Sequence, residues 1–265
     1  MTRRLFASAG MAVAALVTLL AHEPAALAAD QWVSRPLTLP RGTFAFDAGL
    51  GVANVGDGKN PAVIGAGANL EGAVGITSSF QLGLRTGVRG GLDGRSLQAD
   101  NYGRLYDSLY FGTGQSTVAN PEISVRGSLV RAEVVELGLE GRTWLPFEPG
   151  THPGILFGVP MMLHLLGMMR LDMGAYVPFI TANPIQSGLI VPVDVWFQPT
   201  RKFWIGPLTG LAFRKAGTDL RAGAGLGYQL VSFVDFKAQF VFPHINQDNG
   251  AREFGFGAGF QIRIE

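Results

Sequence analysis

The last stretch of the chain, EFGFGAGFQIRIE from Glu253 to Glu265, decides the fold. Its apolar side chains occupy every second position, at Phe254, Phe256, Ala258, Phe260, Ile262 and Ile264. The positions between them carry Gly, Gln or charged residues. Because successive side chains of a β-strand point to opposite faces, the pattern predicts a strand with one continuous apolar face.

The same alternation recurs along most of the chain. FQLGLRTGVRG, residues 80–90, is the clearest internal example, with Phe, Leu, Thr and Val opposing Gln, Gly and Arg. Comparable segments lie near residues 43–53, 62–73, 121–130, 133–145, 154–167, 169–181, 189–197, 203–211, 220–230 and 234–242. We therefore predict an all-β protein of about twelve strands, counted from these segments together with residues 80–90 and 253–265.

The composition favours strands that cross a membrane. The chain has 265 residues, of which 47% are hydrophobic and 15% charged, and its 37 Gly are unusually many. Its mean hydropathy is +0.23, yet no clean apolar run of eighteen or more residues lies outside the N-terminal region. Apolar content that alternates with polar positions is typical of membrane barrels. A net charge of +1 gives no argument for nucleic acid, and the lack of Cys excludes disulfides and thiol chemistry.

The first residues have the features of an export signal. Arg3 and Arg4 precede an apolar run over residues 5–20, and Ala26-Leu27-Ala28 matches a cleavage site. Residues 2–6 also resemble a twin-arginine signal, but that route exports folded cargo, which does not suit a barrel. We predict a signal peptide at 1–28, a periplasmic lead-in at 29–41 that contains two Pro, and a barrel at 42–265.

The connections between the predicted strands alternate in length. Those near 78, 131, 168, 200 and 232 are short, and those near 57, 105, 150, 184, 217 and 248 are generally longer. Short periplasmic turns and longer external loops are typical of outer-membrane barrels, and an even strand number places both termini in the periplasm. A sheet in lipid must also have no unpaired edge. The prediction is a closed antiparallel transmembrane β-barrel.

On this pattern, residues 42–265 resemble bacterial outer-membrane β-barrel proteins. The closing strand is similar to the C-terminal signal that such proteins present to the barrel assembly machinery, through Phe260, Ile262 and Ile264. It differs in ending on Glu265, where an aromatic residue is usual. The resemblance implies localisation in the bacterial outer membrane, with outer-membrane lipid and the assembly machinery as partners.

The charged residues of the strands fall on the inward parity. We take fourteen of them as candidates for lining a pore: Asp47, Glu71, Arg85, Arg89, Arg126, Glu136, Glu140, Arg142, Arg170, Asp172, Asp194, Arg221, Asp235 and Lys237. They either line a weakly selective aqueous pore or pair across the lumen and brace it. The long segment 92–120 carries Tyr102, Tyr106 and Tyr110, candidates for an external contact or a constriction.

Residues 154–169, GILFGVPMMLHLLGMM, are apolar on both faces. The inward side either binds a hydrophobic ligand or is covered by a plug or a partner. The simpler alternatives are a filled lumen and a transmembrane helix, which Pro160 disfavours. His164 falls on the inward parity, where a single His is more often structural than catalytic.

The sequence offers no catalytic constellation. Outer-membrane phospholipases and lipid A deacylases place a His two positions before a nucleophilic Ser, but Gly154 follows His152 and Asn246 follows His244 at that spacing. The His residues lack zinc-ligand spacing. We therefore expect no enzyme, cofactor or metal site, and favour a porin-like passive channel for small solutes. A non-conducting structural or surface-binding barrel with a salt-bridged lumen is the alternative, and an outer-membrane hydrolase is the weakest one.

Overall fold

The computed structural model describes residues 31–55, 63–90, 121–146, 152–181, 185–215, 217–248 and 250–265. These residues form twelve strands. Their bounds are β1 Phe44–Val55, β2 Val63–Thr77, β3 Phe80–Gly90, β4 Glu122–Arg131, β5 Val135–Trp144, β6 Gly154–Leu165, β7 Met169–Ile180, β8 Gln186–Phe197, β9 Phe203–Arg214, β10 Gly217–Val231, β11 Val234–Phe242 and β12 Phe254–Ile264.

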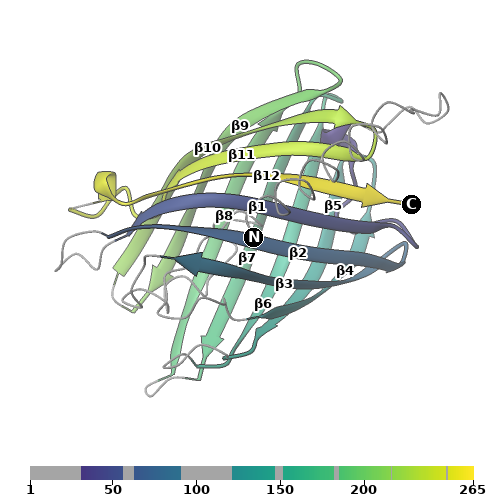
Figure 1. Ribbon diagram of the computed structural model, residues 1–265. Coiled ribbons are helices and arrows are strands. Elements are labelled where there is room, and N and C mark those ends of the chain that lie inside the picture. The colour runs from purple at the N-terminus through teal and green to yellow at the C-terminus, as the bar shows by residue number, and fades with distance from the viewer. Residues whose placement is uncertain are drawn as a thin grey trace, which may run out of the picture.

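The strands form one closed barrel in which each strand pairs with its neighbours in the sequence. Closure comes from antiparallel pairing of β1 with β12, in a register that runs from Phe44 opposite Ile264 to Asn54 opposite Phe254. Figure 1 shows β1 lying between β2 and β12, with the strands tilted around the barrel. The prediction of a closed antiparallel barrel of about twelve strands is confirmed.

The sequence alternation separates an apolar outer surface from a polar lumen. In β6, Ile155, Phe157 and Val159 are exposed on the outside, while Leu156 between them is buried. In β3, Leu84 is exposed whereas the adjacent Arg85 is buried. A soluble protein buries its apolar side chains and exposes its charges, so this barrel has the inverted arrangement that lipid requires.

Four strands, β2, β8, β9 and β10, extend three or more residues beyond the predicted segments. We expected a turn over residues 215–219, but β10 begins at Gly217, because residues 217–219 pair with residues 212–214 of β9 and lengthen the hairpin. The loop expected over residues 181–187 is likewise shorter, since β8 begins at Gln186, which pairs with Ile180. Neither change alters which side chains face the lumen.

Residues 31–39, here named the lumenal segment, lie inside the barrel. They begin with a 3-10 helix, Trp32–Ser34, and continue without regular secondary structure, with a bend at residues 37–38, toward β1. Trp32, Val33, Arg35 and Leu37 are buried, and their partners are inward-facing residues of the strands. The segment lies at the end of the barrel where β1 begins and β12 ends. No helix among the described residues is long and apolar enough to cross a membrane.

Candidate functional site in the barrel lumen

Charged side chains of β4 and β5 form the best-connected ionic group of the lumenal wall. The carboxylate of Glu140 accepts a hydrogen bond from Arg126 Nε at 2.8 Å and another from Arg142 Nε at 2.6 Å. Arg142 also pairs with Glu122 through Nη1. Glu140 and Arg142 are buried. Alternating positive and negative groups offset the cost of removing each charge from water.

A second ionic group lies on β1, β11 and β12. Asp47 accepts hydrogen bonds from Lys237 Nζ at 3.2 Å and from Gln261 Nε2 at 2.8 Å. Strand register places Glu71 opposite both Asp47 and Arg85 on the adjoining strands. Farther round the wall, Arg221 Nη2 lies 3.6 Å from Asp194 Oδ1. Several of the predicted inward charges therefore lie beside an oppositely charged residue, although the register also places Asp172 opposite Asp194.

The apolar part of the lumen comes from five neighbouring strands, β5 to β9. The buried side chains of this cluster are Trp144, Leu156, Tyr176, Ile180, Ile190 and Ala212. Leu156 belongs to the segment that is apolar on both faces, and it is 1% exposed. Residues 154–165 of that segment form strand β6 and the rest form the turn into β7, so the helix alternative is wrong. Inward side chains of β6 such as Leu156 fill space within the barrel.

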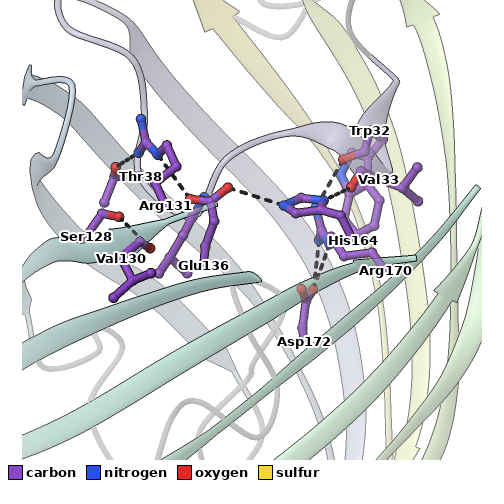
Figure 2. A network of polar contacts seen from close by, with 11 residues as sticks. Trp32, Val33, Thr38, Ser128, Val130, Arg131, Glu136, His164, Arg170 and Asp172 are labelled. Atoms are coloured by element: carbon purple, nitrogen blue, oxygen red, sulfur yellow. Dashed lines mark hydrogen bonds and ion pairs between the residues drawn. The ribbon is translucent and has the colours of Figure 1, made fainter. Parts of the chain in front are cut away.

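The lumenal segment is bound by polar side chains of the wall. Figure 2 shows His164 between two oxygen acceptors, with Nδ1 2.8 Å from the carbonyl oxygen of Val33 and Nε2 3.2 Å from Glu136 Oε1. One ring nitrogen of His164 therefore contacts the lumenal segment, and the other contacts a carboxylate of β5. The second oxygen of Glu136 accepts from the Leu37 backbone N–H at 3.1 Å and from Arg131 Nε at 3.2 Å.

Three arginines from strands β4 and β7 extend these contacts. Arg170 donates from Nη1 to the carbonyl oxygen of Trp32 at 3.0 Å, and from Nε and Nη2 to Asp172 Oδ2. Arg126 Nη1 donates to the Leu37 carbonyl oxygen at 3.2 Å. Arg131 Nη2 donates to Thr38 Oγ1 at 2.7 Å. The strand arginines thus bind the segment's backbone and hydroxyl groups.

The segment contributes one strong ion pair of its own. Arg35 binds Asp235 of β11 through both terminal nitrogens, with Nη2 3.1 Å from Oδ1. Asp235 is 0% exposed, and Arg263 Nη2 lies 3.8 Å from it. Together with the contacts to β4–β7, this pair anchors the segment on opposite parts of the wall.

Most of the predicted pore-lining residues have partners within the barrel, but those partners were not all foreseen. Sequence reasoning missed the roles of Trp32, Arg35 and Arg131, and it gave His164 a structural role without a partner. The sequence did offer one signal of these contacts. Trp32 and Arg35 lie three residues apart in a segment that was expected to lie in the periplasm. The side chain of Arg89 and the loop candidates Tyr102, Tyr106 and Tyr110 lie outside the described residues.

The described residues contain no group of three or more His, Asp or Glu side chains placed to hold a metal ion. The lumen instead presents paired charges, an apolar cluster and a bound segment of the same chain. Chemically, this arrangement can bind, exclude or admit a solute.

Comparison with known proteins identifies the fold through structure alone. No family model and no curated protein sequence matches the chain. Among solved structures, the KdgM porin aligns with a TM-score of 0.58 at 9% identity, over 83% of this chain and 99% of that one. The NanC porin gives 0.59 at 8% identity, over 83% of this chain and 100% of that one. The COG4313 outer membrane channel from Pseudomonas putida F1 gives 0.56 at 10% identity, over 92% and 100%.

Proposed function

We propose that this protein is a porin-like channel of the bacterial outer membrane, which passes small solutes and is closed at its periplasmic end by its own lumenal segment. The closed barrel, the charged lumen and the fold shared with solved porins support the proposal. It assigns the barrel transport and no catalytic step.

The outer surface supports the membrane location. Apolar side chains such as Leu50, Leu84 and Phe157 are more than half exposed on the outside of the barrel, at 69%, 55% and 58%. Exposed apolar surface on every strand would drive association in water, whereas lipid chains solvate it. We accordingly keep residues 1–28 as a proposed signal peptide and the closing strand as a proposed signal for the barrel assembly machinery.

The observation that carries the proposal is how the lumenal segment is held. Barrel side chains, and not a β-ladder, accept hydrogen bonds from backbone N–H groups of the segment. Val33 N–H donates to Gln198 Oε1 at 3.0 Å, and Leu39 N–H donates to Gln81 Oε1 at 2.8 Å. Release of the segment would therefore break side-chain contacts and leave every strand pair of the barrel intact. An element bound in this way can open locally while the barrel stays folded.

Gly75 of β2 gives the segment room to pass. A Cβ at this position would lie 2.0 Å from the Pro40 carbonyl oxygen and 2.7 Å from that of Leu39. These atoms are backbone, so a side chain at position 75 would force the end of the segment to shift. At Gly72 on the same strand, a Cβ would lie 3.6 Å from the Phe44 ring, an ordinary contact.

These two glycines provide a matched test. Wild type, Gly75→Ala and Gly72→Ala would be refolded and studied one channel at a time in planar bilayers. We expect infrequent openings in wild type and Gly72→Ala, and a higher open probability in Gly75→Ala. If all three fold and insert but never conduct, the channel proposal is wrong.

One observation favours a second function, a non-conducting structural barrel. Glu140 is bound by two arginines at once, as expected of a braced lumen. The experiment on the two glycines decides between the functions, because a braced barrel stays silent in every variant. We propose small solutes as the class of transported molecule and name no particular solute. The KdgM porin has been solved in complex with disordered oligogalacturonate, and that ligand is assigned to KdgM alone.

A further inference from the structure

The indole of Trp32 occupies a slot built by strands β7, β8 and β9. Its ring is stacked on that of Trp204, with centroids 4.9 Å apart and planes 6° apart. Trp196 meets it edge-on at 5.1 Å and 70°. The guanidinium carbon of Arg170 lies 3.5 Å from the centroid of the Trp32 ring. The slot therefore surrounds one flat ring with two indoles and a cation.

The two indole walls are held by the barrel and not by the lumenal segment. Trp204 lies against Gly227 of β10, where a Cβ would come within 2.1 Å of its ring atoms. Trp196 lies against Gly225 of the same strand, where a Cβ would come within 2.6 Å. Each indole thus fits over a position that has no side chain, and this support remains when Trp32 is absent.

The cationic wall is also held independently. Arg170 donates from Nε at 3.1 Å and from Nη2 at 2.8 Å to Asp172 Oδ2, its neighbour on the same face of β7. Its Nη1 donates to the Trp32 carbonyl oxygen of the lumenal segment. The guanidinium therefore keeps its charge partner and its position when the segment leaves. All three walls are pre-organised, which lowers the cost of binding a ligand.

We propose that this slot is a binding site for a flat aromatic ring of a solute, which takes the place of Trp32. Stacking on Trp204 favours a π-system, and the Arg170 guanidinium is attracted to the face of such a ring. A puckered saturated ring presents neither a flat face nor a π-quadrupole to these walls. The ligand class is therefore aromatic and not merely apolar.

Because the slot holds the lumenal segment, binding of a solute there would affect transport. This inference rests on the proposed function. A solute ring in the slot competes with the return of Trp32. Because the solute and Trp32 cannot occupy the slot together, a bound solute increases the fraction of molecules in which the lumenal segment is released. An aromatic solute would thus prolong the open state of the channel.

Ring binding is measured on the full chain without reference to conductance. Trp32→Ala empties the slot and leaves the backbone of the segment in place. Calorimetric titration in detergent micelles would compare indole with cyclohexylmethanol, a puckered apolar ring. Micelles without protein would supply the heat of partition. We expect Trp32→Ala to bind indole roughly tenfold more tightly than cyclohexylmethanol.

Trp144→Ala is the matched control, since it removes a buried indole from a cluster that has no cation and no second indole. Its other members are Leu156, Tyr176, Ile180, Ile190 and Ala212. We expect that cavity to show no marked preference between the two probes. An equal preference in both variants, or none in Trp32→Ala, would overturn the proposal. Folding is checked by the heat-dependent gel migration of barrels, and Trp32→Leu serves as a second variant if Trp32→Ala does not fold. A positive titration with a silent channel would reject only the transport step.

Discussion

Arg35 of the lumenal segment and Asp235 of β11, two hundred residues apart in the sequence, form a buried pair with two hydrogen bonds. The carboxylate of Asp235 is inaccessible to solvent, and its other cation, Arg263, lies at 3.8 Å. The pair joins the segment to the part of the wall that lies opposite β4–β7. It is therefore the contact whose loss should affect closure most directly.

Arg35→Ala should loosen the lumenal segment. Removal of one partner from a buried pair costs up to about 3 kcal/mol, because the remaining carboxylate loses its best hydrogen-bond donors. We expect faster cleavage of the segment by added protease and more frequent channel openings. Arg41→Ala is the control, since Arg41 is exposed just beyond the segment. Equal protease resistance in both variants and wild type would exclude an anchoring role for Arg35.

His164→Phe should also loosen the segment, from the side opposite Arg35. The substitution removes both ring nitrogens, one that contacts the Val33 carbonyl oxygen and one that contacts the Glu136 carboxylate. Loss of such contacts costs about 1–3 kcal/mol. Hydrogen exchange of residues 31–39 should speed up, whereas His244→Phe, in a turn between β11 and β12, should leave it unchanged. Identical exchange in both variants would contradict the assignment.

Glu140→Gln should make an open channel prefer anions. The substitution removes one negative charge from the lumenal wall and leaves Arg126 and Arg142 with less compensation. The measurement is the reversal potential in a salt gradient. Glu133→Gln makes the same charge change at an exposed position in the turn between β4 and β5, and should leave selectivity unaltered. An unchanged reversal potential in conducting Glu140→Gln would show that Glu140 does not line the route.

Leu226→Arg should destabilise the barrel in lipid more than Leu230→Arg. Both leucines face outward with similar exposure, 37% and 39%, but Leu226 is near the middle of β10 and Leu230 is one residue from its end. A cation on the lipid face costs about 2–4 kcal/mol at the bilayer midplane and about 0–1 near the interface. Urea unfolding from lipid vesicles measures the difference. Equal costs would contradict the membrane placement of this strand.

The architecture was predictable because the alternation of apolar and polar side chains can be recognised within each strand separately. The alternation of Phe254, Phe256 and Phe260 with Gly255, Gly257 and Gly259 determines which face meets lipid, whatever the neighbouring strand contains. The same reasoning placed Asp47 and Arg142 in the lumen. It did not find the true start of β10 at Gly217, because pairing with β9 and not side-chain periodicity extends that strand.

The closure of the lumen was not predictable from the same evidence. Alternation tells which face a side chain occupies, but not which residue it meets across the barrel, so the pairing of Asp235 with Arg35 had no local signal. The lumenal segment has no strand periodicity, and Pro36 indicated only an extended connection. Its place depends on contacts with Glu136, His164 and other residues distant in the sequence.

The most direct test of the account is to lock the lumenal segment in place and measure conductance. Thr38 Oγ1 donates to the Ser78 carbonyl oxygen at 3.2 Å, and the chain has no native Cys. Thr38→Cys/Ser78→Cys would be cross-linked by oxidation or by a short bis-methanethiosulfonate reagent, with Thr38→Cys alone as control. We predict that locking abolishes the openings and that reduction of the disulfide restores them. Openings that persist in the locked channel, with the cross-link verified by mass, would contradict closure by this segment.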